Sequence, residues 1–344
     1  MAPSLIRSPV QLPPVEALAL SQQAPAILQS SPSTVSSSAL GSLFSAAEKP
    51  ELWIQYENLI LSSLRTGDDR AAQECLDRLV ARFGNNDRVK ALGGLIKEAQ
   101  AQNNGELEKI LKEYDQMLEE NNTNLPIMKR RIALLRSMGR LSDAASALVQ
   151  LLDFSPTDSE AWSELSDLYF SQGLYPQAIY AMEEVLILAP NAWNVHARLG
   201  ELQYMAATAS GATSGSYQKQ MAEAIKRFSR SIELCDDYLR GYYGLKLVRS
   251  AVGAAKMIWL LTPSQVTKRL LNDNTKPAKQ TDDEDFSLPD SNTIERLNEL
   301  ATAKLAEIVR HSSAQDRGWR GYGAAEVAAA RELLSEDAPS GIER

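Results

Sequence analysis

Side chains that could take part in catalysis or metal binding are few in this sequence. The two histidines, His196 and His311, lie far apart along the chain, and neither belongs to a His-Glu-x-x-His pattern that would hold zinc on one helix face. The two cysteines, Cys75 and Cys235, form no Cys-x-x-Cys pair and sit in apolar helical patterns typical of buried packing residues. The sequence therefore predicts no catalytic residue, no metal ligand and no cofactor, so the protein is not expected to be an enzyme.

Two short stretches have compositions that can bind ions. Residues Gly318–Gly323, "GWRGYG", are glycine-rich like a phosphate-binding loop, but no strand precedes them and no Lys-Ser or Lys-Thr pair follows. We therefore expect an ordinary turn there. The acidic run Asp282–Asp285 lacks the ligand spacing of a calcium loop, and we expect it to be part of a solvated linker.

The charge balance narrows the class of partner. The 344 residues include 36 basic and 44 acidic side chains, which gives a formal net charge of −8. Because nucleic-acid phosphates are bound by basic surfaces, this balance argues against a general nucleic-acid binder. The apolar run at Lys256–Leu261 is much shorter than the roughly 20 residues that a membrane-spanning helix needs, so no direct bilayer span is predicted.

The elements that must position the remaining side chains are helices that follow a repeat. From Trp53 onwards, apolar residues recur at steps of three and four, and short polar breaks separate paired amphipathic segments. Four glycines, Gly67, Gly105, Gly139 and Gly173, are 38, 34 and 34 residues apart. A glycine at this place tolerates the positive φ that ends the first helix of a pair.

Fixed positions after each glycine indicate how the two helices of a pair would pack. Five residues after the glycines lie Ala72, Ile110, Ala144 and Ala178. Most of these side chains are small, which lets the second helix approach the first closely. A larger apolar residue follows one turn later, and a helix breaker such as Pro190 closes the unit.

The pattern resembles the tetratricopeptide repeat, a helix–turn–helix unit of 34 residues. The positions of the best unit that carry its signature are Trp162, Leu165, Tyr169, Gly173, Ala178 and Pro190. Ser166 replaces the glycine usual in that signature, and Met182 replaces the usual phenylalanine. The stretch Ala206–Gln218 makes the next unit about 12 residues longer than the repeat permits. We expect this stretch to form an extended loop between the two helices of that unit.

The predicted fold is all-α, a tetratricopeptide-repeat superhelical solenoid with C-terminal helices and a disordered N-terminal tail. Repeats are expected near residues 53–86, 87–124, 125–158, 159–192 and 193–238, with a sixth partial repeat after them. The predicted organisation is a disordered tail over 1–48, the solenoid over 49–261, a polar acidic linker over 262–291, helices over 292–336 and a disordered tail over 337–344.

Solenoids of this kind bind partners along a concave groove lined by the first helices of the repeats. The candidate groove residues are Lys129, Ala133, Arg136, Asp167, Phe170 and Arg198. The stretch Met128–Arg136 carries four basic side chains on one first helix. It predicts either an ordinary solvated helix face or a patch for an acidic partner segment.

One binding class can be tested from residue types alone. Tetratricopeptide domains that dock chaperones hold a terminal carboxylate with Lys, Asn and Arg side chains at fixed groove positions. Those positions are occupied here by Lys129, Ala133, Glu164, Asn194 and Arg198. Two of the five match, and Glu164 would repel the carboxylate, so this class is disfavoured but stays an alternative.

Longer stretches make the resemblance more specific. The sequence resembles the family of subunit 2 of the endoplasmic reticulum membrane protein complex over Leu52–Leu95, Lys112–Leu134, Glu160–Asn191 and Ser229–Val248. The distinctive segments are Arg88–Leu92 and Lys129–Ala133, because they do not belong to the generic repeat consensus. Residues 1–48 and 206–218 have no counterpart in this resemblance.

The resemblance implies a non-catalytic scaffold on the cytoplasmic side of the endoplasmic reticulum membrane, peripheral to it, within an insertase for transmembrane segments. The implied partners are the cytosolic segments of membrane-spanning subunits and a globular cytosolic subunit, in a hetero-oligomer. One alternative is a free tetratricopeptide-repeat adaptor that binds chaperones or client proteins. Another is an enzyme that uses the repeats as a substrate platform, which would need a catalytic fold within the short, polar segment 262–344.

Overall fold

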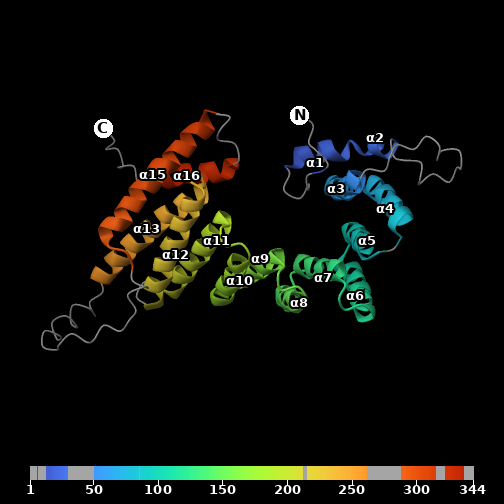
Figure 1. Cartoon of the computed structure of the whole chain (residues 1–344), viewed down its shortest axis with the longest axis horizontal. Coiled ribbons are helices and arrows are strands. Elements are labelled where there is room, and N and C mark those ends of the chain that lie inside the picture. The colour runs from blue at the N-terminus through green and yellow to red at the C-terminus, as the bar shows by residue number, and fades with distance from the viewer. Residues whose placement is uncertain are drawn as a thin grey trace. The chain divides into compact units, whose positions relative to one another are not determined.

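The computed structural model is helical throughout the elements that it describes, and the predicted all-α class is confirmed. It describes residues 6, 13–29, 50–84, 86–211, 215–261, 288–314 and 322–336. The chain divides into two compact units, Met1–Pro156 and Thr157–Arg344, which are described separately. In Figure 1 the first unit runs from blue to green and the second from green to red.

The first unit contains three helix pairs of the repeat type. They are α3 (Pro50–Thr66) with α4 (Asp69–Phe83), α5 (Asp87–Gln100) with α6 (Asn104–Glu120), and α7 (Leu125–Ser137) with α8 (Leu141–Phe154). Helices α5 and α7 begin at the residues that open the second and third predicted repeats. Each pair buries apolar side chains that neither helix could cover alone, as a repeat architecture requires.

The helix starts are set by side chains that cap the first turn. Asn86 and Asn124 accept hydrogen bonds from the backbone amides three residues later, over 2.9 Å at Val89 and 3.2 Å at Ile127. Asp158 does the same at the start of the second unit, over 3.1 Å. These caps satisfy amide groups that an α-helix leaves unpaired at its start. They recur at nearly the repeat length, a signal that the sequence carries beside the glycines.

The predicted turn glycine is confirmed at three of the four predicted places. Gly67, Gly139 and Gly173 have φ of 76°, 74° and 73°, the left-handed conformation that ends the first helix of a pair. Gly105 is different, because it lies inside the first turn of α6. Helix α5 instead ends at Gln100 and is followed by Ala101 with an extended backbone, so the turn of the second pair needs no positive φ.

The N-terminal segment differs from the prediction of a disordered tail over 1–48. Within it, the structure has α1 (Pro14–Ser21), which packs on α3, and α2 (Ala24–Gln29), which contacts α4 (Figure 1). Leu20 is fully buried and Leu28 is largely buried in the same core as Tyr56. The rest of 1–48 lies outside the described residues.

The prolines of this segment explain why composition misjudged it. Pro14 stands in the first turn of α1 and Pro25 is the second residue of α2, where the missing N–H breaks no helical hydrogen bond. The apolar residues Ala17, Leu20, Ala24 and Leu28 follow at helical steps and are buried. Their spacing indicates helix, whereas the Ser, Pro and Gln content of the region suggested disorder.

The second unit contains the remaining helices. They are α9 (Ser159–Ser171), α10 (Tyr175–Leu188), α11 (Trp193–Ser210), α12 (Gly215–Leu234), α13 (Leu239–Leu261), α15 (Ser291–Ser313) and α16 (Ala324–Glu336). The first four form two helix pairs, and α13 packs on both α11 and α12. Helices α9 and α11 begin at the residues that open the fourth and fifth predicted repeats.

The expected long loop over residues 206–218 is wrong for 206–210 and 215–218, which are helical, whereas residues 212–214 lie outside the described residues. Helix α11 has 18 residues and α12 has 20, compared with 13 and 14 in the preceding pair, so the extra residues lengthen both helices. Ala207 and Met221 are fully buried and Tyr217 is nearly so. The small, alanine-rich composition that suggested a loop is equally suited to close packing between two helices.

Small residues let the paired helices of this unit touch. Ala178 is fully buried, and the hydroxyl of Ser166, the residue that replaces the usual glycine, donates a 2.8 Å hydrogen bond to the Ala178 carbonyl. In the following layer the ring of Phe228 is flanked by Gly200 of α11 and Gly244 of α13. A Cβ atom at Gly244 would overlap the Phe228 ring, so a glycine is required there.

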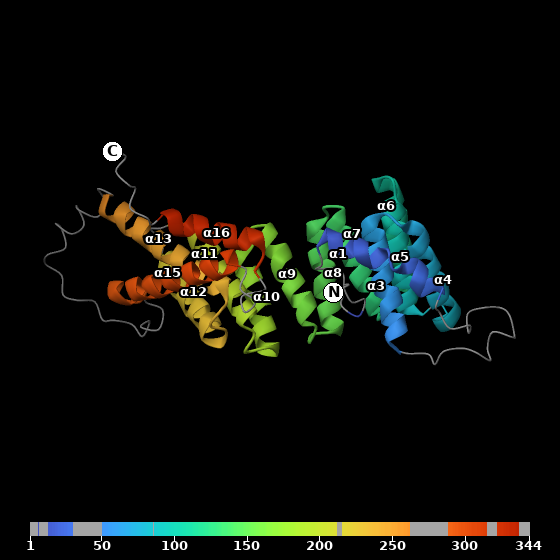
Figure 2. The same ribbon diagram turned by 90° about the horizontal axis from the view of Figure 1, so that it is seen from above.

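The C-terminal helices close the apolar surface of α13. Figure 2 shows α15 and α16 beside α13, and α15 packs on both of them. Leu305 and Ile308 of α15 and Ala330 of α16 are fully buried in the same core as Phe228. Residues 262–287 of the predicted linker and the tail 337–344 lie outside the described residues.

One of the two histidines lies buried in the first turn of α11. His196 is 6% exposed, and its Nε2 lies 3.0 Å from the Pro190 carbonyl oxygen, which can only accept, so Nε2 carries the proton. Its Nδ1 is buried and has no hydrogen-bond partner among the described residues. Burial lowers the pKa of His196, and the nearby Arg227 and Arg230 lower it further, while the Pro190 hydrogen bond raises it.

The contact between Gly244 and Phe228 predicts a matched pair of substitutions on α13. Gly244→Ala should lower the free energy of unfolding by about 1–3 kcal/mol, because the Phe228 ring has to move. Gly253→Ala should leave it unchanged or raise it by about 0.5–1 kcal/mol, since a Cβ there meets nothing within 4 Å. Urea denaturation of both variants measures the difference, and equal midpoints would contradict the packing described.

The burial of His196 predicts a pH dependence of stability. Because its pKa is lowered in the folded chain, the unfolded chain takes up the proton first as the pH falls. Stability should therefore be complete above the ordinary histidine pKa of about 6.5 and decline below it. In His196→Gln, whose amide can also donate to the Pro190 carbonyl, urea midpoints should fall less steeply between pH 7 and pH 5. An unchanged slope in the variant would rule out this origin.

Candidate functional site

The predicted groove residues lie on three first helices. Lys129, Ala133 and Arg136 share one face of α7, where Lys129 and Arg136 are exposed and Ala133 is half-buried. Asp167 and Phe170 lie on α9 and Arg198 lies on α11. Helix α7 belongs to the first unit and α9 and α11 to the second, so each unit contains three of the six residues.

The three predicted residues of the second unit come together around Arg198. Its guanidinium donates to Asp167 Oδ1 over 2.9 Å and to Glu201 Oε2 over 2.7 Å. Its Cζ lies 4.9 Å from the centre of the Phe170 ring, a cation–π contact. The structure thus links α9 to α11 through one arginine that contacts two carboxylates and one aromatic ring.

The basic stretch of α7 is partly used within the chain. Arg130 binds both carboxylate oxygens of Glu98 on α5, and Arg131 donates to Asp115 Oδ1 of α6 over 2.6 Å. These two arginines therefore hold α7 to the preceding pair. Of the four basic residues in the stretch, Lys129 and Arg136 are the ones that remain exposed to solvent.

The Glu98 carboxylate also fixes a buried tyrosine. Tyr114 is 1% exposed, and its hydroxyl donates to Glu98 Oε1 over 2.6 Å. Burial and the hydrogen bond to Glu98 raise the pKa of Tyr114, so the phenol stays protonated. A Cβ at Gly94 would overlap the Tyr114 hydroxyl, which explains a glycine in the interior of α5.

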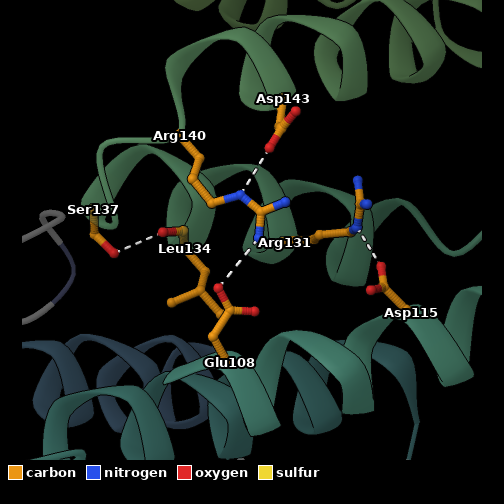
Figure 3. A network of polar contacts seen from close by, with 7 residues as sticks. All are labelled: Glu108, Asp115, Arg131, Leu134, Ser137, Arg140 and Asp143. Atoms are coloured by element: carbon orange, nitrogen blue, oxygen red, sulfur yellow. Dashed lines mark hydrogen bonds and ion pairs between the residues drawn. The ribbon is translucent and has the colours of Figure 1, made fainter. Parts of the chain in front are cut away.

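A second polar network joins α6, α7 and α8, as Figure 3 shows. Arg140, at the turn between α7 and α8, donates to Asp143 over 2.7 Å and to Glu108 of α6 over 3.3 Å. These residues are about half exposed, so solvent screens the ion pairs and each contributes little to stability. Their effect is to set the position of exposed side chains beside α7.

The second unit also contains a hollow of about 370 Å³ between α11, α12, α13 and α16. It is lined by Asn194, Ala197, Arg198, Glu201, Tyr204, Phe228, Tyr238, Leu239, Arg240, Tyr243, Gly244, Leu247, Glu326 and Ala329. The predicted groove residue Arg198 lies at this hollow, beside Asn194 of the chaperone-clamp positions. Sequence reasoning missed the rest of it, because it could not place α16 against α11 and α13.

Charged groups beside the hollow are paired with one another. Arg198 binds Glu201, and Arg240 of α13 donates to Glu326 of α16 over 2.9 Å. The Gly323 amide donates to the same Glu326 over 2.9 Å. The Gly323 hydrogen bond and Arg240 both lower the pKa of Glu326, so its carboxylate is ionised at neutral pH.

In the second unit, the arginine at a chaperone-clamp position is already bound to carboxylates of the chain itself. Arg198 has its guanidinium between Asp167 and Glu201, and Glu164 lies half-buried on α9. An incoming carboxylate would have to displace one of two anions already bound to Arg198. The structure therefore adds to the sequence argument against that binding class.

Of the histidines and cysteines that sequence analysis considered for catalysis, His196 and Cys75 are buried, and Cys235 and His311 are half-buried. Burial raises the pKa of the Cys75 thiol to about 12, so it stays protonated and unreactive. Within the described ranges, no three His, Cys, Asp or Glu side chains are grouped so that they could bind a metal ion. In the same ranges no helix combines the length and apolar character needed to span a membrane. Residues 282–285 and 318–321 lie outside the described residues.

Comparison with known proteins places these helices in a family. Residues 81–223 match the family model described as the EMC2 TPR-like repeat domain. The chain is 31% identical over 256 residues to TPR repeat protein oca3 of Schizosaccharomyces pombe, a match that covers 74% of this chain and 82% of that protein.

Relatives named for a membrane complex match over a shorter span. ER membrane protein complex subunit 2-A of Xenopus laevis is 31% identical over 195 residues, which is 57% of this chain and 61% of that protein. Subunit 2 of Saccharomyces cerevisiae is 30% identical over 136 residues, 39% of this chain and 46% of that protein. With its paired helices, its 34-residue stride and these relatives, the chain belongs to the tetratricopeptide-repeat family of ER membrane protein complex subunit 2.

Proposed function

We propose that this chain is a non-catalytic scaffold subunit of an ER membrane protein complex, held at the cytoplasmic side of the endoplasmic reticulum membrane. It would organise the cytosolic segments of membrane-spanning subunits and a globular cytosolic subunit of an insertase for transmembrane segments. The observation that carries the proposal is the family match over residues 81–223, together with relatives named as subunit 2 of that complex.

The described side chains support a binding role. In the first unit, Lys129 and Arg136 stand exposed on the same face of α7, beside arginines that hold the helix in place. In the second unit, the Arg198 cluster and the neighbouring hollow offer fixed polar and aromatic groups. Rigid side chains lose little conformational entropy on binding, so such surfaces suit the recognition of flexible segments.

The alternative of a free adaptor for chaperones or clients is weaker. It requires Lys129 and Arg198 to hold a peptide carboxylate, yet Arg198 already binds Asp167 and Glu201. A chaperone C-terminal peptide that bound with micromolar affinity, and lost binding on Lys129→Ala or Arg198→Ala, would favour the adaptor.

Purification of the tagged full-length chain from detergent-solubilised membranes tests the scaffold. Membrane-spanning proteins should be recovered with it in constant proportion, and mass spectrometry identifies them. The double charge reversal Lys129→Glu with Arg136→Glu should lower their recovery several-fold, because it inverts the charge of an exposed face that the proposal assigns to partners.

The matched control is Lys109→Glu with Lys112→Glu, which reverses two exposed charges on α6 outside the predicted groove. It should leave the recovery of membrane-spanning partners unchanged. The scaffold is refuted if the unmodified chain is recovered alone or only with soluble chaperones. Equal losses in both double variants would instead show that α7 has no special part in assembly.

A further inference from the structure

Helices α1 and α2 cover an apolar surface at one end of the first unit. In Figure 1 they lie on the far side of α3 and α4 from α5. Their buried apolar side chains follow one another at steps of three and four, and they are Ala17, Leu20, Ala24 and Leu28. The last three belong to the same core as Cys75 of α4. The two helices therefore take the place that a preceding repeat would have in a longer array.

These two helices are held less firmly than the helices beneath them. Helix α1 has 8 residues and α2 has 6, whereas α3 has 17 and α4 has 15. Helices shorter than about 12 residues are barely stable alone in water, so α1 and α2 depend on their contacts with α3 and α4. Those contacts lie on one side of α1, since Val15 and Leu18 of its opposite face are 77% and 46% exposed.

The packing of α2 against α4 is incomplete. A hollow of about 350 Å³ lies between them, lined by Ala24, Pro25 and Leu28 on one side and by Asp68, Arg70, Ala71, Glu74 and Arg78 on the other. Cys75 lies beside this hollow, because it shares a face of α4 with Ala71 and Arg78, four residues before it and three after it. Departure of α2 would therefore bring water to the Cys75 thiol, which is fully buried now.

We propose that α1 and α2, residues 14–29, form a lid that opens while α3 and α4 stay folded, and that the uncovered surface then binds an amphipathic helix of another protein. That helix carries small and large apolar residues at the spacing found in the lid. A single longer helix has an advantage, because it can cover more of α4 than α2 does and fill the hollow. A second copy of the chain competes poorly, because residues 30–49 tether each lid close to its own identical site.

A reversible disulfide can hold the lid closed. The Ser21 hydroxyl of α1 lies 3.0 Å from the Thr66 hydroxyl of α3, so Ser21→Cys with Thr66→Cys brings two thiols within reach of each other. In the full-length chain, alkylation of Cys75 by N-ethylmaleimide, followed by mass spectrometry, measures how often the lid is open. The disulfide should slow this alkylation at least about tenfold, and its reduction should restore the rate. Cys235, which is half-buried in the second unit, should be alkylated equally fast in both forms.

Two leucines of α1 give a matched pair of substitutions. Leu20 is fully buried under the lid, whereas Leu18 is exposed. Leu20→Ala should speed the alkylation of Cys75 at least about tenfold, because it removes apolar contacts that keep the lid closed. Leu18→Ala should leave the rate unchanged. Urea separates lid opening from unfolding of the whole unit, because opening exposes little surface and the alkylation rate should rise less steeply with urea than the unfolded fraction measured by circular dichroism.

A fluorescently labelled peptide of residues 13–29 probes the uncovered surface. It should bind Leu20→Ala with at least about tenfold higher affinity than the unmodified chain, because the loosened lid leaves the surface open more often. It should not bind the double-cysteine variant while the disulfide is intact. A peptide of the same composition in scrambled order should bind none of these forms, because its apolar residues do not share one helix face.

Any of four results would overturn the proposal. They are equal alkylation of Cys75 with and without the disulfide, alkylation that follows the unfolded fraction in urea, peptide binding that survives the disulfide, and no binding of millimolar peptide to Leu20→Ala. Dimers of the unmodified chain that the disulfide abolishes in light scattering would overturn the assignment to another protein, and would assign the lid to exchange between copies. No membrane-spanning protein enters these measurements, so their outcome is independent of the proposed scaffold.

Discussion

Close approach between helices, made possible by a minimal side chain opposite a large one, is the constraint on which both units depend. Ala178 is fully buried where the two helices of its pair meet, and its carbonyl accepts a hydrogen bond from Ser166. Phe228 fits between two glycines of neighbouring helices, and Tyr114 fits over Gly94. An isolated pair leaves one apolar side uncovered, so the next layer has to supply the cover. The same contacts between helices therefore stabilise each pair and require a further pair to cover it.

The parts of the fold that could be predicted are those fixed by local backbone chemistry. The turns at Gly139 and Gly173 need a positive φ, which favours glycine, and a proline closes the unit because it cannot continue a helix. These residue types can be recognised in the sequence whatever the packing around them. Gly105 misled because an identical residue at the same stride can also stand inside a helix. Residues 14–29 and 206–218 misled because small residues and prolines are compatible with helices when their neighbours provide a surface. That surface belongs to distant segments, which composition does not report.

The candidate site was predictable only in part, because the sequence gives the identity of a charge but not its partner. The repeat register predicts that Asp167, Phe170 and Arg198 lie close together, because equivalent positions of successive first helices are neighbours, and Arg198 does contact both. That they bind a partner stays a prediction. The register did not reveal that Arg130 is committed to Glu98. Nor could it reveal the wall that α16 provides, because no repeat relates α16 to the helices it covers.

The unequal lengths of the helices in the second unit have an evolutionary consequence. Helices α11 and α12 follow a pair of 13 and 14 residues, yet on their other side they meet α13, which has 23. Their additional turns lean on α13, where the Tyr217 hydroxyl donates to the Ala251 carbonyl over 3.1 Å. Helices α11 and α12 therefore join short helices on one side to a long helix on the other, and a neighbouring pair could not replace them. Recombination that adds or deletes a whole repeat is tolerable where the repeats have equal length. At α11 and α12 it would expose the buried side chains Tyr217 and Met221 to solvent.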